Sequence, residues 1–402
     1  KAGSKRQVSN RESTLSEFSG IKLPFLILGF SRLFYTKLAE YGMKVGNLLQ
    51  DENFAAMYSG FSVVMAICVS EFLCVIFLMV LYKGCTMMEK RQNQEGMKTT
   101  DTAISCISTL FYGRYSYLIS DFFVVFAFLS GVIWGNRRQG ENTGFLLEFS
   151  AYVHKYWMIY GILIAVTFIL SVTVLNKTFE YIRKEDKRFA RISFQSGVHI
   201  SMVHGVFFAI FCAVMAEQIV GVLKPTNGEI VLGMLRIGSA VVALGAVCCY
   251  YGRFLISAGK KLYAMGAIVL ASVIVFIGNL IFSLIGKWSF HVCILIGIVG
   301  LAVLWFVMGN FAYRLMRVRM DWLQILIMPL GAGCISGLAC MLLGKVLTPH
   351  LGDGMTLFVT LLLAIFIYWV VLLLLRNFKE QELDMIFGGK LIYALGQVLR
   401  VY

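Results

Sequence analysis

Nine long apolar stretches, each sufficient to cross a lipid bilayer, constrain this chain more than any other feature of its sequence. A bilayer core about 30 Å thick is crossed by about 20 helical residues, because each residue adds about 1.5 Å. A tenth stretch, residues 21–50, begins with an apolar run and then carries four charged residues. We therefore predict an all-α, polytopic integral membrane protein with about nine or ten transmembrane helices. The nine stretches cover residues 54–82, 104–134, 156–175, 196–222, 230–252, 262–286, 289–313, 323–347 and 355–375.

The composition excludes other classes of protein. Of the 402 residues, 59% are hydrophobic and 14% are charged, against roughly 25% charged in soluble proteins. This excludes a soluble globular enzyme and a disordered chain. The net charge of +14 suits basic loops at a membrane, so we expect no nucleic-acid partner. Most of the ten cysteines lie inside apolar runs without CxxC spacing, which predicts packing residues and no metal site.

The distribution of basic residues predicts the topology, because loops rich in Lys and Arg stay in the cytoplasm. One set of alternate connections (83–103, 176–195, 253–261, 314–322 and the tail 376–402) holds 20 basic residues. The opposite set (135–155, 223–229, 287–288 and 345–353) holds six. The C-terminus is therefore predicted to be cytoplasmic. A membrane-crossing helix at 21–50 would place the basic N-terminal residues on the same side.

These patterns divide the chain into five segments. Residues 1–20 form a basic cytoplasmic tail, and residues 21–175 hold the first group of helices. Residues 176–195 mix apolar and basic side chains, which predicts an amphipathic linker helix at the inner membrane surface. Residues 196–375 form the C-terminal helix bundle, and 376–402 form a second amphipathic helix at the cytoplasmic surface.

Charged residues at bilayer depth are the strongest functional signal, since they are costly in hydrocarbon and face a partner or a wet cavity. Glu71 and Arg114 lie about 15 Å deep in consecutive helices, so they could pair. Arg114, Tyr117 and Asp121 fall on one helix face. Such a face suits a hydrated, substrate-binding cavity or a buried ion-pair network that fixes the helix register. The sequence leaves both alternatives open.

A second pair repeats this pattern near the outer side of the membrane. Glu217 and Arg236 lie within about a turn of the same depth in neighbouring stretches, which is typical of a static ion pair or of two cavity contacts. His204 lies within an apolar stretch, where a histidine is more often a satisfied packing residue than a ligand. There is no Walker loop and no HExxH motif, so the sequence predicts no enzyme, no metal site and no cofactor.

Five segments together resemble one transporter superfamily. Residue by residue they are weakly specific, but their order and spacing match the multidrug/oligosaccharidyl-lipid/polysaccharide exporter superfamily, most closely its branch of polysaccharide-biosynthesis proteins similar to stage V sporulation protein B. NFAAMYSGF opens the segment that resembles the sixth helix, and RYSYLISDFFVVF resembles the seventh. The five segments are residues 53–83, 114–126, 183–224, 252–282 and 367–395.

The resemblance implies a flippase that moves an undecaprenyl-pyrophosphate-linked saccharide across the bacterial cytoplasmic membrane. Arg114 and Arg236, beside Tyr117, would contact phosphate, because arginine forms paired hydrogen bonds to it. Asp121, Glu71 and Glu217 would couple ions or neutralise the arginines. Members of the superfamily have fourteen helices in two lobes, and this sequence aligns from the fifth, so a second chain or a further segment would supply the first four.

Two alternatives remain at this stage. A shortened member could be a non-transporting scaffold that holds a glycosyltransferase or polymer synthase in the membrane, with 177–194 and the C-terminal helix as docking surfaces. Alternatively, the protein could be a cation-coupled multidrug exporter of the same superfamily. In all three hypotheses membrane lipids are its immediate partners.

Overall fold

The computed structural model describes most of the C-terminal two thirds of the chain. The described residues are 34, 36–38, 40–48, 58, 65, 69, 148–149, 151–223, 228–319, 321–378, 382, 393 and 397. The chain forms two compact units, one made of residues 1–124 and 135–154 and the other of residues 125–134 and 155–402. Within the first unit, the described residues are helical, and the rings of Tyr41 and Tyr58 meet edge to face with centroids 5.4 Å apart.

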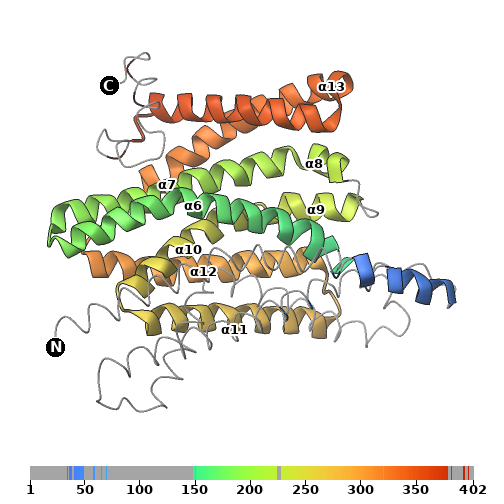
Figure 1. Ribbon diagram of the computed structural model, residues 1–402, viewed down its shortest axis with the longest axis horizontal. Helices are drawn as coiled ribbons and strands as arrows, with labels where there is room; N and C mark the ends of the chain where they lie inside the picture. Colours follow the sequence, from blue (N-terminus) through green and yellow to red (C-terminus); the bar gives the residue numbers. More distant parts are fainter. Residues whose placement is uncertain are drawn as a thin grey trace, which may run out of the picture. The chain divides into compact units, whose positions relative to one another are not determined.

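The described part of the second unit is a bundle of helices and contains no strand (Figure 1). Long neighbouring helices run side by side, as α6 with α7 and α11 with α12. Two helices begin with a wider π-helical turn, η1 (Tyr152–Trp157) before α6 and η2 (Leu323–Ile327) before α13. The helices are α6 (Met158–Arg183), α7 (Lys187–Val214), α8 (Ala216–Leu223), α9 (Gly228–Gly238), α10 (Ala240–Ser257), α11 (Lys261–Ile285), α12 (Phe290–Met316) and α13 (Met328–Leu374).

Six helical segments in the described residues are long and apolar enough to cross a membrane. The last of them spans 52 residues, Leu323–Leu374, which as a straight helix would be roughly 78 Å long. Instead α13 doubles back on itself (Figure 1), because Gly352 takes a non-helical conformation (φ 70°, ψ 169°) that favours glycine. The hairpin therefore contains the two stretches predicted at 323–347 and 355–375. The structure confirms an all-α, multi-pass membrane protein.

Two of the expected uninterrupted helices are broken. The stretch 196–222 bends at Met215, between α7 and α8, and the stretch 230–252 breaks at Ser239, between α9 and α10. At the second break, the hydroxyl groups of Tyr156 on η1 and Tyr160 on α6 donate to the carbonyl oxygens of Gly238 and Leu235, respectively. Buried carbonyl groups released by a helix break need such donors, and hydropathy alone does not show where these donors lie.

The expected amphipathic helix over 177–194 is wrong as a single element. Helix α6 continues to Arg183, and α7 begins at Lys187. Glu185 takes a left-handed backbone conformation (φ 61°), and the Asp186 carboxylate accepts a hydrogen bond from the Phe189 N–H at 3.2 Å, which caps α7. The basic segment is therefore the tight turn of a helical hairpin.

Helix packing around α7 depends on glycine. A Cβ atom at Gly205 would lie 2.8 Å from the Ala243 Cα of α10, so the two backbones meet there without side chains between them. About two turns earlier on α7, Gly197 makes room for the ring of Tyr250. These contacts set α7 in the centre of the bundle, between α6, α10 and α13.

The described connections divide between the two ends of the bundle in the same way as the count of basic residues divides them. The turns at 184–186, 258–260 and 317–321 lie at one end, and the turn at 286–289 and the α13 apex lie at the other (Figure 1). The three described turns of the more basic set thus lie at one end. That this end faces the cytoplasm stays a prediction.

Candidate functional site

Glu217 and Arg236 form the ion pair that their depths predicted. Arg236 Nη2 of α9 donates to Glu217 Oε1 of α8 at 2.6 Å. Glu217 lies in the first turn of α8, where the partial positive charge of a helix N-terminus favours a carboxylate. The Glu217 side chain is 64% exposed and that of Arg236 is 49% exposed. The pair therefore lies at the surface of the bundle and is not sealed in a dry core.

His204 has a partner within its own helix. Its Nδ1 atom lies 2.9 Å from the Ile200 carbonyl oxygen, one turn back along α7. Its ring meets Trp369 of α13 edge to face, with centroids 5.7 Å apart. These contacts are those of a packing residue, and they give His204 no link to the ion pair.

The remaining predicted site residues lie outside the described residues. They are Glu71, Arg114, Tyr117 and Asp121. Their pairing and their shared helix face stay predictions, as does the amphipathic character of most of 376–402.

A second group of polar residues, which the sequence did not single out, is buried between α7 and the end of α13. His199 Nε2 lies 3.0 Å from Asn377 Nδ2, and His199 Nδ1 lies 3.7 Å from Glu382 Oε2. The Ser196 hydroxyl, one turn before His199, lies 3.4 Å from Glu382 Oε1. The side chains of His199 and Glu382 are only 4% and 9% exposed, respectively.

The chain reaches this cluster because α13 ends in a tight turn. Arg376 takes a left-handed conformation (φ 52°), and the Asn377 N–H donates to the Leu372 carbonyl oxygen at 3.1 Å. The turn directs the chain back onto α7 and brings Phe378 over the ring of His199, with centroids 4.7 Å apart. Such a closing motif satisfies carbonyl groups at a helix C-terminus.

The cluster is built to hold the chain together and shows no activated nucleophile. The Ser196 hydroxyl lies 2.9 Å from its own helix carbonyl, Ile192 O, and near Glu382, whereas the imidazole contacts Asn377 and Glu382. A serine hydrolase needs its histidine on the serine oxygen. Only the i, i+3 spacing of Ser196 and His199 could have pointed to this cluster. Glu382 belonged to a segment that we assigned to the membrane surface.

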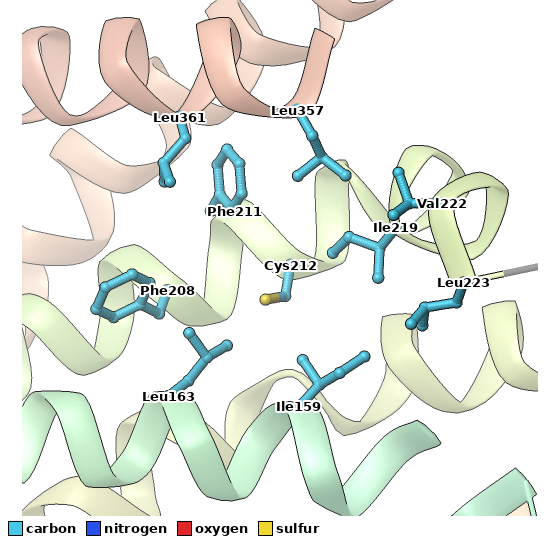
Figure 2. A pocket seen from close by; sticks show the side chains of 10 residues that line it. All are labelled: Ile159, Leu163, Phe208, Phe211, Cys212, Ile219, Val222, Leu223, Leu357 and Leu361. Atoms are coloured by element: carbon cyan, nitrogen blue, oxygen red, sulfur yellow. The ribbon is translucent and has the colours of Figure 1, made fainter. Parts of the chain in front are cut away.

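An apolar groove lies between α6, α7, α8 and the second half of α13 (Figure 2). Its volume is about 240 Å³, and every side chain that lines it is apolar or a cysteine. Figure 2 shows Ile159 and Leu163 of α6 on one side and Leu357 and Leu361 of α13 on the other. The lining residues are Ile159, Leu163, Phe208, Phe211, Cys212, Ile219, Val222, Leu223, Leu357 and Leu361.

The groove and the ion pair share helix α8. Ile219 lines the groove, and Glu217 lies two residues earlier, about 3 Å along the helix axis. A hydrocarbon chain in the groove and a charged group at the Glu217–Arg236 pair would therefore lie at similar depth.

No family profile, no curated protein and no solved structure matches this chain.

Proposed function

We propose that this protein moves a lipid-linked polar molecule across a membrane, with an undecaprenyl-pyrophosphate-linked saccharide as the first candidate. The observation that carries the proposal is that one helix, α8, lines an apolar groove and also carries Glu217 of the exposed Glu217–Arg236 pair. A lipid chain finds no polar group to desolvate in such a groove. The Arg236 guanidinium, on the neighbouring helix α9, supplies the geometry that phosphate oxygens prefer.

The burial pattern of α8 supports this division of roles. Its two faces differ, because Ile219 and Val222 line the groove while Glu217 is more than half exposed. In the proposed mechanism the lipid chain stays in the groove or in bilayer lipid. The phosphate of the headgroup replaces the Glu217 carboxylate as the partner of Arg236. The carboxylate of Glu217 holds the guanidinium in place when no substrate is present. The Arg236 guanidinium thus always has a counter-ion.

The proposal is tested by filling the groove. In proteoliposomes that contain a fluorescent undecaprenyl-pyrophosphate saccharide, the wild-type protein should increase transfer to the other leaflet above that of protein-free vesicles. Leu361→Trp places an indole in the groove and should abolish the increase. Leu362→Trp is the matched control, because Leu362 is 54% exposed on the neighbouring face of the same helix.

Three outcomes decide the matter. Loss of transfer in Leu361→Trp with normal transfer in Leu362→Trp supports the proposal. Equal transfer in both variants contradicts the role of the groove. Wild-type transfer no faster than in protein-free vesicles contradicts translocation and favours the scaffold hypothesis.

A further inference from the structure

The apex of the α13 hairpin holds buried polar groups that the described residues do not satisfy. Thr356 is fully buried, and its hydroxyl has no hydrogen-bond partner among them. The same is true of Gln218 Oε1 on α8. A buried polar atom without a partner destabilises the fold, so two such atoms at this end of the bundle need an explanation.

Thr356 lacks a partner because the helix starts too late. Buried hydroxyl groups elsewhere in the bundle bond to the carbonyl oxygen three or four residues back, as Thr360 does to Thr356 O at 2.6 Å and Thr178 to Val174 O at 3.0 Å. For Thr356 the residue four back is Gly352, where the backbone leaves the helix. The acceptor four residues back is therefore out of position, and the hydroxyl makes no bond to the Asp353 carbonyl oxygen three residues back either.

The register of the hairpin brings Gln218 and Thr356 to one level. Cys340 Sγ lies 3.8 Å from the Thr360 carbonyl oxygen, so in the antiparallel hairpin Gly344 is level with Thr356, one turn closer to the apex. A Cβ atom at Gly344 would lie 3.5 Å from Gln218 Nε2. The absence of that side chain lets the Gln218 amide enter the space beside Thr356.

Asp353 supplies a carboxylate one turn away. Asp353 and Thr356 share a face of α13, and Gln218 and Gly221 share a face of α8. The Asp353 carboxylate occupies the place where a Cβ atom of residue 221 would lie. The Asp353–Gly221 contact is thus next to the Thr356–Gln218 level, so two helices bring three oxygen-bearing side chains to adjacent levels.

We propose that Asp353, Gln218 and Thr356 bind an alkali-metal cation such as Na⁺ where the α13 hairpin turns. Carboxylate, amide and hydroxyl oxygens are the ligands of hard cations. The last carbonyl groups before Gly352 cannot complete helical hydrogen bonds and can add further ligands, as broken helices do for ions in membrane proteins. One carboxylate balances one positive charge, whereas a divalent ion would keep an uncompensated charge at bilayer depth.

The other charged groups at this end leave room for a cation. Glu217 is paired with Arg236 at 2.6 Å, and Lys345 and His350 are exposed. Lys224 follows Gly221 by three residues and lies outside the described residues. If its ammonium group occupied the site, an added alkali cation would have no effect, so the experiment distinguishes the two occupants. The inference does not depend on the proposed lipid translocation.

The test is the thermal unfolding midpoint of the purified protein in NaCl, KCl or choline chloride at equal ionic strength. A cation at about a hundred times its Kd should raise the midpoint by roughly 3 °C over choline. Asp353→Asn and Thr356→Val should each remove most of this increase. Thr360→Val is the matched control, since Thr360 is equally buried but its hydroxyl is satisfied within α13.

An increase with Na⁺ or K⁺ that is lost in Thr356→Val and kept in Thr360→Val supports the site. Equal midpoints in all three salts would overturn it, as would an increase that survives in both Asp353→Asn and Thr356→Val. If Thr356→Val does not yield folded protein, the partly exposed Asp353 provides the deciding variant. Because transfer of lipid is not measured, failure here leaves the proposed function untouched.

Discussion

Where α13 ends against α7, buried polar side chains contact one another, whereas at the α13 apex Gln218 Oε1 and the Thr356 hydroxyl lack partners among the described residues. His199 lies 3.0 Å from Asn377 and 3.7 Å from Glu382. Gln218 Oε1 and the Thr356 hydroxyl, by contrast, are buried without a hydrogen bond. The first group compensates part of its own desolvation, because Asn377 Oδ1 is the one side-chain atom of its three residues that is buried without a hydrogen bond in the described structure. The second needs a group from outside. The His199 cluster therefore has a structural role, whereas the apex has the character of a binding site.

Removing His199 from its buried cluster should have the largest effect on stability. His199→Ala takes the imidazole away from a buried carboxylate and should lower the free energy of unfolding by about 3 kcal/mol, because the remaining charge stays desolvated. His204→Ala, on the same helix, should cost less, since His204 bonds only within α7. Unfolding in one detergent by both variants checks the difference. Equal losses of free energy of unfolding would show that the cluster does not stabilise the fold more than His204 does.

The apex should respond in the opposite way when a hydroxyl is removed. In choline chloride, Thr360→Val breaks a satisfied hydrogen bond and should cost about 1 kcal/mol. Thr356→Val removes a hydroxyl that has no partner in the described residues, so it should change the free energy of unfolding by less than about 0.5 kcal/mol. If Thr356→Val is the more damaging of the two, its hydroxyl has a permanent partner and the contrast between the ends fails.

The exposed ion pair should matter least for stability. Arg236→Gln removes a pair whose side chains are about half exposed, and such pairs contribute roughly 0–1 kcal/mol. We expect an unchanged unfolding midpoint together with a slower transfer of the lipid-linked saccharide. A large loss of stability would identify Arg236 as a structural residue and remove it from the proposed site.

The helices were predictable from hydropathy because a membrane span needs an uninterrupted apolar run. The stretches 262–286 and 289–313 correspond closely to α11 and α12. The apex was also predictable, since the short polar stretch at 345–353 separates two apolar runs. The breaks at Met215 and Ser239 were not, because both lie inside apolar sequence. Their positions depend on tertiary partners, such as the Tyr156 and Tyr160 hydroxyl groups.

The candidate sites divide along the same line. Glu217 and Arg236 are close in sequence and at matched depth, so simple geometry brought them together. His199 and Glu382 belong to distant segments, and only the turn after α13 joins them. The three residues at the apex are likewise joined by the hairpin register and by the space at Gly221 and Gly344. Spacing within one helix cannot reveal either arrangement.

The most direct test of the account asks which lipid lies in the groove. A benzophenone amino acid is placed at Leu361, which lines the groove, or at Leu362, which is 54% exposed, in cells that make undecaprenyl-linked saccharides. After irradiation, mass spectrometry identifies the adducts. The account predicts undecaprenyl-pyrophosphate saccharide enriched at position 361 and bulk phospholipid at position 362. The same bulk phospholipid at both positions would contradict it.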